Sequence, residues 1–285
     1  EDAGRKVPEA VRRKRSIYYE FEGKLARAML VDPDTNPVTF FDAQFESIHT
    51  AETARILKTA TSDITRRIEL VKKNDPAFSD DDEHRIMIDV SRGLLGIYQG
   101  IEGVNKGPNV IIADFPLKWT VVGMGKLFDT GINAVITSQR AIPASLMDPK
   151  IKNRSRLFYL MANIEASNFS GENNWALLLD PDGFISEGTG DNFFIIKDGI
   201  VITPEGRNVL RGVSRDYVMN TLCEQLKLPM IEKNIETYDV YTADEAFMTG
   251  TPFCMLPVTS LNSIPIGNGK VGPIFSKLIN QWSQN

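Results

Sequence analysis

Residues 192–203 read "NFFIIKDGIVIT", in which two apolar runs are joined by Asp198-Gly199. Both runs are rich in β-branched and aromatic side chains, which favour extended strands. An Asp-Gly pair readily adopts the left-handed backbone that a two-residue hairpin turn requires. The segment therefore predicts a β-hairpin and a strand-rich fold for the second half of the chain.

The rest of the second half carries further strand and helix signals. Short runs bounded by Gly, Pro or Asp predict strands at "INAVITS" (132–138), "WALLLD" (175–180), "AFMTG" (246–250) and "MLPVTSL" (255–261). The sequence "DPDGF" (180–184) predicts a tight turn. Apolar residues at helical spacing predict two helices, with Leu157, Leu160, Met161 and Ile164 in the first and Val218, Leu222 and Leu226 in the second.

The first half mixes helical and strand-like segments. We expect helices at "HTAETARILKTATSD" (49–63) and at "DDEHRIMIDVSRGLLGIYQG" (81–100), where acidic residues precede an apolar run. "NVIIADF" (109–115) predicts a strand. The glycine-rich stretch near 118–125 predicts a linker between a first domain, 1–117, and a second domain, 126–285. The fold class is therefore α+β, with a strand-rich C-terminal domain.

Composition and charge exclude several classes of function. The 285 residues allow two modest domains. The net charge of -5 provides no positive electrostatic field that would attract nucleic acid. The cysteines Cys223 and Cys254 and the histidines His49 and His84 lack the spacing of a metal site. No apolar run reaches the length of a membrane span, and "EDAGRKVPEA" has no signal-peptide core. We expect a cytoplasmic protein with reduced thiols and no metal.

Four features of the second half could carry chemistry, although each also fits an ordinary structural role. Gly212-Val213-Ser214 opens a predicted helix, whose free amides suit a phosphate but equally suit a plain helix start. Thr251 offers a hydroxyl in a tight turn. Glu187 lies between a strand end and a strand start, where it is either a rigid buried acid or a solvated one. Lys150 and Lys152 precede a helix, and an amine nucleophile there would need a lowered pKa.

The order and spacing of these segments closely resemble the fold-type IV pyridoxal-phosphate enzymes. This group comprises branched-chain aminotransferases, D-amino acid transaminases, (R)-selective amine transaminases and aminodeoxychorismate lyases. The resemblance covers roughly residues 85–285 and rests on "DPKIKN", "ISEGTGDNFFIIKDGIVITP", "VLRGVSRDYV", "ADEAFMTGTPFCMLPVTSL" and "IGNGKVGPI". It implies a small N-terminal α/β domain and a larger C-terminal pseudo-barrel that binds pyridoxal 5′-phosphate.

The resemblance also implies roles for individual residues. Lys152 stands thirteen residues before Glu165-Ala166, as in the amine-transaminase branch, so it would be the Schiff-base lysine and the proton carrier. Glu187 would pair with the pyridine nitrogen and keep it protonated. The cofactor phosphate would be held by four residues, namely Arg55, Val213, Ser214 and Thr251.

The sequence departs from the family pattern around the substrate. The tyrosine that usually follows the lysine is replaced by Arg156 and Leu157, and Tyr159 lies beyond the usual register. The loop "VSRGLLGIYQGIEG" lacks the Arg and His by which D-amino acid enzymes grip a carboxylate. The residues that could contact substrate instead are Arg92, Tyr98, Arg140 and Arg156, although each arginine also fits a structural ion pair.

The resemblance implies an aminotransferase that moves an amino group from an amino acid or amine to a 2-oxo acid by two half-reactions. Two alternatives stay open. One is a lyase of the aminodeoxychorismate lyase type, and the other is a descendant that binds pyridoxal phosphate without catalysis. The family also implies a homodimer with shared active sites. The amino donor, the acceptor and the stereoselectivity do not follow from the sequence.

Overall fold

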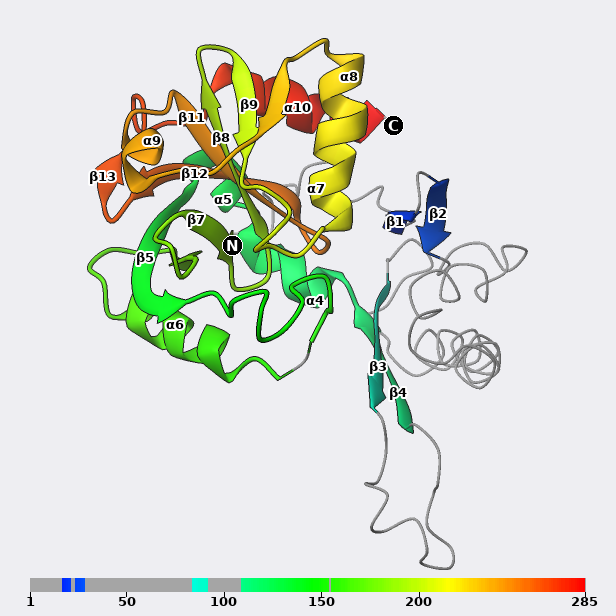
Figure 1. The fold of residues 1–285 in the computed structure, drawn as a ribbon. Coiled ribbons are helices and arrows are strands. Elements are labelled where there is room, and N and C mark those ends of the chain that lie inside the picture. The colour runs from blue at the N-terminus through cyan, green and yellow to red at the C-terminus, as the bar shows by residue number, and fades with distance from the viewer. Residues whose placement is uncertain (1–16, 22–23, 29–83, 92–108, 154, 285) are drawn as a thin grey trace, which may run out of the picture. The chain divides into compact units, whose positions relative to one another are not determined.

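The computed structural model describes residues 17–21, 24–28, 84–91, 109–153 and 155–284 (Figure 1). The chain divides into two compact units, one including Lys14–Thr120 and the other including Val121–Asn285. The stretch named above as a linker forms two short helical turns, α4 (Lys118–Val121) and η2 (Val122–Met124). The domain limits 1–117 and 126–285 stay a prediction.

The described part of the first unit, Lys14–Thr120, contains two antiparallel strand pairs. Strand β1 (Ile17–Phe21) pairs with β2 (Lys24–Ala28). Strand β3 (His84–Ser91) pairs with β4 (Asn109–Pro116), which confirms the strand predicted at "NVIIADF". The helix predicted at 49–63 lies outside the described residues.

The prediction of a helix beginning at residue 81 is wrong, because His84–Ser91 is strand β3. Ile86, Ile88 and Val90 alternate with other residues at a spacing of two, which is the period of a strand. All three are also β-branched, and this type favours strands over helices. The preceding acids suggested a helix start, but the alternation behind them carried the stronger signal.

The second unit is built around a closed sheet. Its strands follow the order β8-β11-β12-β5-β6-β7, and β7 pairs with β8 again, so the ring closes into a barrel. The strands are β5 (Ile132–Arg140), β6 (Asn174–Leu179), β7 (Ile185–Gly188), β8 (Asn192–Lys197), β11 (Glu245–Gly250) and β12 (Cys254–Leu261). All four strand runs and the pseudo-barrel are thereby confirmed.

The hairpin predicted at residues 192–203 contributes one strand to the wall of this barrel, and its second strand extends beyond the barrel. Strand β8 pairs antiparallel with β9 (Ile200–Thr203), and Asp198 and Gly199 take φ angles of 50° and 78° in the turn. These left-handed values are those that an Asp-Gly turn was expected to supply. Strand β10 (Met230–Glu232) adds to β9 in parallel, and β13 (Ile264–Pro265) adds to β12.

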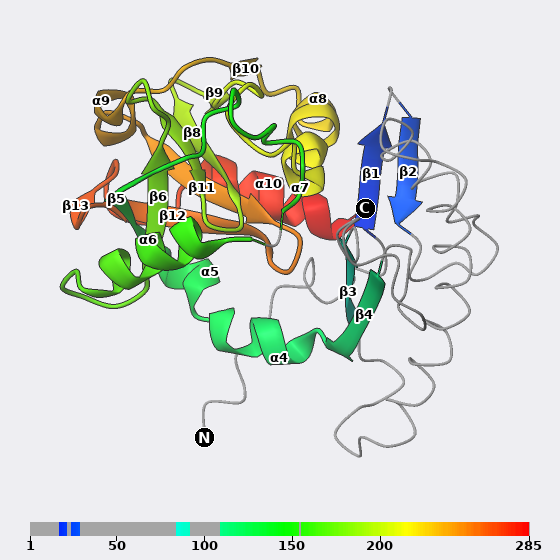
Figure 2. The same ribbon diagram turned by 60° about the horizontal axis from the view of Figure 1, so that its bottom comes forward.

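Helices cover the barrel on separate sides (Figures 1 and 2). One core cluster joins α7 (Val213–Tyr217), the π-turn η3 (Val218–Leu222), α8 (Cys223–Gln225) and α10 (Pro273–Gln284) to the hairpin strands. Within it the rings of Phe194 and Phe247 stack with centroids 4.7 Å apart. This unit also contains the short helices α5 (Leu127–Thr130) and α9 (Thr237–Tyr241).

Helix α6 (Leu157–Ser167) packs on β5 and β6 through small residues. Ala162 and Ala166 are buried there beside Val135, and Phe158 and Tyr159 pack against the same cluster. The helix confirms the predicted segment, but the four larger apolar residues that suggested it are exposed. The small side chains let α6 approach the sheet closely, which brings Tyr159 toward the interior. Among the described residues no helix is long and apolar enough to cross a bilayer.

Candidate active site

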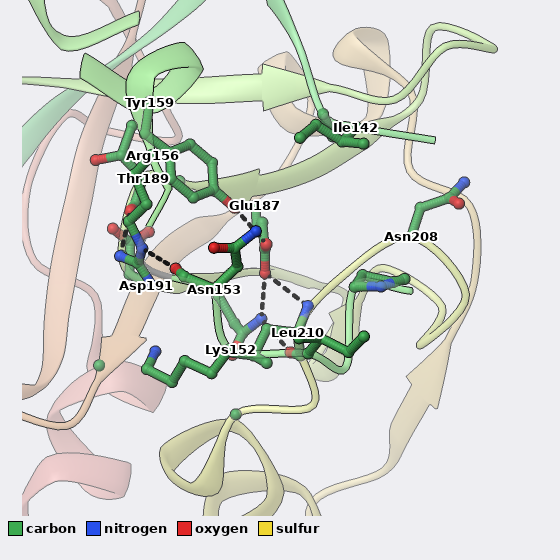
Figure 3. Close-up of a pocket in the computed structure, with 18 of the residues that line it drawn as sticks. Ile142, Lys152, Asn153, Arg156, Tyr159, Glu187, Thr189, Asp191, Asn208 and Leu210 are labelled. Carbon is green, nitrogen blue, oxygen red and sulfur yellow. Dashed lines mark hydrogen bonds between the residues drawn. The ribbon is translucent and has the colours of Figure 1, made fainter. Parts of the chain in front are cut away.

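An open pocket lies in the second unit, and its empty space including the mouth is about 820 Å³ (Figure 3). Its walls come from the loop before α6, the first turn of α6, the end of β7, the start of α7 and the end of β11. Residues that the sequence separates widely therefore face one space. Lys152, Glu187, Val213, Ser214 and Thr251 all line it.

Glu187 is fixed in this pocket by three hydrogen bonds. Its Oε1 accepts from the Tyr159 hydroxyl at 2.9 Å, and its Oε2 accepts from the Asn192 side-chain amide at 3.1 Å and the Leu210 backbone N–H at 2.9 Å (Figure 3). The same Asn192 amide donates to the Leu210 carbonyl at 2.8 Å. Glu187 is only 8% exposed. It is therefore the rigid buried acid, not the solvated turn acid.

Two acids, Glu187 and Asp191, are buried near one another in the pocket, and both have raised pKa values. Burial raises the pKa of Glu187 to about 7, although its hydrogen bonds from Leu210 and Tyr159 and the nearby charges of Lys152 and Arg156 oppose the rise. Burial and the charge of Glu187 raise the pKa of Asp191 to about 8. Such a pair favours the arrival of a cationic group between or beside the acids.

Lys150 and Lys152 both lie in the loop before α6 but differ in their surroundings. Lys152 lines the pocket, and its charge acts on Glu187. Lys150 is not among the lining residues and pairs with Asp148 at 3.3 Å on the exposed loop. Of these two lysines, Lys152 is therefore the one that presents an amine to the same space as the buried acid.

One end of the pocket suits an anion. Helix α7 begins there at Val213 with Gly212 as its N-cap, and no side chain caps the first amides. A Cβ on Gly212 would collide with Oδ1 of Asn192, so this approach of backbone to side chain requires glycine. Thr249 and Thr251 lie at the end of β11, and the buried Thr249 hydroxyl has no hydrogen-bond partner among the described residues. Open amides and a spare hydroxyl are groups that a phosphate would satisfy.

Arg156 lies at the start of α6 and lines the pocket. It donates to the carbonyl oxygens of Asn153 at 2.9 Å and Thr189 at 3.2 Å, and its guanidinium lies 5.4 Å from the centroid of the Tyr159 ring. Among the described residues it forms no ion pair with a carboxylate. The arginine is thus a positive charge held by backbone carbonyls at the edge of the pocket.

The other predicted site residues do not gather here. Arg140 ends β5 and donates to the carbonyls of Thr137 at 3.0 Å and Ser138 at 3.3 Å, but it does not line the pocket. Arg55, Arg92 and Tyr98 lie outside the described residues.

Sequence reasoning missed three residues of the site. Tyr159 was set aside because of its register, yet its hydroxyl bonds to Glu187. Asn192 and Asp191 belong to the quoted "EGTGDN" stretch but were given no role. Tyr159 lies three residues after Arg156, so one helical turn places both on the same face, but this spacing does not identify Glu187 as the partner.

A family model described as "Amino-transferase class IV" matches residues 49–261, which is more than half of the chain. The chain belongs to the class IV aminotransferase family. A branched-chain-amino-acid aminotransferase of Pseudomonas aeruginosa is 32% identical over 196 residues, covering 68% of this chain and 55% of that protein. A Methanocaldococcus jannaschii protein, named provisionally for the same activity, is 39% identical over 153 residues, covering 53% and 52%. The chain spans about half the length of these curated relatives.

Solved structures of class IV aminotransferases share the fold. A branched-chain amino acid aminotransferase from Thermobaculum terrenum, solved in its PLP-form, has a TM-score of 0.66 at 22% identity. The match covers 100% of this chain and 87% of that one. The fold is therefore α+β of fold type IV, as the sequence resemblance implied.

Proposed function

We propose that this protein is a pyridoxal-phosphate-dependent aminotransferase that moves an amino group from an amino acid or amine to a 2-oxo acid. The observation that carries the proposal is the shared pocket of Lys152 and Glu187, with the start of α7 at its anion-binding end. An amine, a rigid buried acid and a phosphate-binding end are the three groups that such chemistry needs from the protein.

The described residues fit this cofactor. Within the part of the chain that the structure describes, the buried hydroxyl of Thr249 has no hydrogen-bond partner and no side chain caps the first amides of α7, so these groups can bind a phosphate. The buried acids Glu187 and Asp191 favour a cationic ring nitrogen.

We assign the cofactor contacts as follows. Lys152 holds the cofactor through its amine, and Glu187 faces the ring nitrogen. Val213, Ser214 and Thr251 bind the phosphate, and Arg55 is added to them on family resemblance alone.

When bound, pyridoxal phosphate supplies an aldehyde that takes up the amino group and a ring that withdraws electrons from the substrate α-carbon. Lys152 would hold the aldehyde of the cofactor and, as a free amine, would carry a proton away from the substrate α-carbon and return one to the carbon that takes the nitrogen. Glu187 keeps the ring nitrogen protonated by offering a nearby negative charge. Arg156 offers a positive charge to a substrate carboxylate, for which a guanidinium is geometrically suited.

The relatives are named for branched-chain amino acids. We therefore propose L-valine, L-leucine and L-isoleucine as the first donors to test, with 2-oxoglutarate or pyruvate as acceptor. Simple amines and D-amino acids remain in the test because the sequence does not fix the donor.

The test is a single-turnover experiment with purified protein loaded with pyridoxal phosphate. Each donor is added without an acceptor, and the released oxo acid or aldehyde is quantified. An aminotransferase yields about one product molecule per site and then stops until an acceptor is added. A lyase continues to form product without any acceptor, and a non-catalytic binder forms none. The Lys152→Ala variant is the control and should yield none.

We also propose a homodimer with shared active sites and a cytoplasmic location. Family resemblance supports the dimer, and light scattering of the purified protein tests it. Cys223 and Cys254 are both buried, which fits thiols that stay reduced in a cytoplasmic protein. Localisation of a tagged chain by microscopy or fractionation tests the second point.

A further inference from the structure

The two oxygens of Glu187 are held in different ways. Its Oε2 accepts from Asn192 at 3.1 Å and from the Leu210 backbone at 2.9 Å. Asn192 begins β8, the strand that closes the barrel, and Leu210 lies in the loop before α7. Oε1 of Glu187 accepts from Tyr159 alone among the described donors, at 2.9 Å. Because Oε2 already receives two hydrogen bonds, Oε1 is the oxygen with a lone pair left for a further donor.

Tyr159 is itself well placed to donate. It packs against the cluster of Ala162 and Val135 beneath α6, so its ring has little freedom to move. The Arg156 guanidinium lies 5.4 Å from the ring centroid and is anchored by two backbone carbonyls. A cation held over a phenol ring makes its hydroxyl a better hydrogen-bond donor, and a bond to a carboxylate is among the stronger kinds.

We propose that Tyr159 is a positioning residue that holds Oε1 of Glu187 in place and keeps this acid ionised for a cationic ring nitrogen. This inference rests on the proposed function, because it concerns the same pocket and cofactor. Tyr159 acts through Glu187 and performs no proton transfer itself.

The charges around Glu187 show why one hydrogen bond matters. Lys152, from the loop, and Arg156, at the start of α6, favour the ionised acid, whereas Asp191, beside β8, is a like charge. Burial is the largest influence and opposes ionisation, so the pKa of Glu187 rests near 7. Loss of the Tyr159 hydroxyl would raise this pKa further, and the acid would then be largely neutral at physiological pH.

The test measures affinity for 4-deoxypyridoxine 5′-phosphate, which keeps the ring nitrogen and phosphate but has no aldehyde for Lys152. Dissociation constants are determined by calorimetry for the whole chain and for Tyr159→Phe between about pH 6 and about pH 9, a range that spans the titration of Glu187. We expect Tyr159→Phe to bind about tenfold more weakly near pH 6 and equally near pH 9, since one hydrogen bond to a charged group is worth about one pKa unit.

Two controls separate this role from a structural one. Tyr238→Phe removes an exposed hydroxyl on α9 that does not line the pocket, and it should match the unmodified protein. An analogue with carbon in place of the ring nitrogen should bind Tyr159→Phe and the unmodified protein alike. A loss of affinity that is equal at every pH, or equal for both analogues, would overturn the inference and leave the proposed function standing. Absence of binding by the unmodified protein would overturn both.

Discussion

Glu187 and Asn192 form the residue pair through which β7 and β8 close the barrel, and their side chains are joined by a 3.1 Å hydrogen bond. The same Asn192 amide reaches the Leu210 carbonyl, so the closure also fixes the loop that leads to α7. The buried acid and the anion-binding end are therefore set by one structural feature. We infer that the pocket is complete only when the ring of strands is closed.

Asn192→Ala should weaken both the fold and the site. The change removes hydrogen bonds to Glu187 and to Leu210, and we expect a loss of about 1–3 kcal/mol in the free energy of unfolding. Urea denaturation measures the loss, and a cofactor titration should give a weaker dissociation constant. Asn220→Ala is the matched control, because Asn220 is exposed and bonds only within its helix to Asp216 among the described residues. Equal stability of the two variants would contradict the role given to the closure.

Glu187 should make the cofactor-free protein less stable as the pH rises. Burial raises its pKa from 4.5 to about 7, so the folded state keeps a proton that the unfolded chain has already lost in that window. Stability therefore falls as the pH rises from about 4.5 to about 7, by an amount on the order of 3 kcal/mol from this group, and then levels off. Asp191 adds a change of the same sign.

The comparison that isolates Glu187 is Glu187→Gln, which has no proton to lose. Its unfolding free energy, measured in urea across the same pH range, should fall less steeply than that of the unmodified protein. Parallel curves would mean that Glu187 does not titrate as described.

Phe247→Ala should be severely destabilising. Phe247 is fully buried, stacks on Phe194 at 4.7 Å between centroids and lies 5.9 Å from the Phe275 ring. Truncation leaves a cavity in the main core and should cost about 3–5 kcal/mol of unfolding free energy, measured in urea. Phe169→Ala, at an exposed residue just beyond the C-terminal end of α6, should cost far less. A small effect at Phe247 would show that this core is looser than the packing indicates.

Arg156→Leu should impair carboxylate-bearing substrates selectively. We expect KM for a 2-oxo acid acceptor to rise about tenfold or more, because a hydrogen-bonded charge pair is lost. Steady-state kinetics with amino acid and simple amine donors separates this effect from general damage, since an uncharged donor has no carboxylate to lose. Arg140→Leu is the control, because Arg140 also donates to two backbone carbonyls but lies outside the pocket lining. Equal changes in both variants would remove Arg156 from substrate binding.

The strands of the second unit could be predicted because their signals are local. Asp198-Gly199 marks its turn by backbone preference alone, and the structure has the expected left-handed angles there. Strand β3 was mistaken for a helix because the acids before it were weighed above the alternation of Ile86, Ile88 and Val90. Closure of the barrel depends on the long-range pairing of Glu187 with Asn192, which no local pattern contains.

The site could be predicted only in part for the same reason. Family spacing selected Lys152 over Lys150, and in the structure Lys152 lines the pocket whereas Lys150 pairs with Asp148 on the exposed loop. The bond between Tyr159 and Glu187 could not be read from spacing, because it depends on how closely Ala162 and Ala166 let α6 approach the sheet. The sequence shows that Arg156 replaces the usual tyrosine. It does not show that Tyr159, one helical turn later, contacts Glu187.

The most direct test is to load the protein with pyridoxal phosphate, treat it with sodium borohydride and map the labelled peptide. Borohydride fixes the cofactor covalently to the amine that holds it. We predict a pyridoxyl group on Lys152 at about one per chain, and none in Lys152→Ala. A label on Lys150, on any other lysine, or on none would contradict the assignment of this pocket as the catalytic centre.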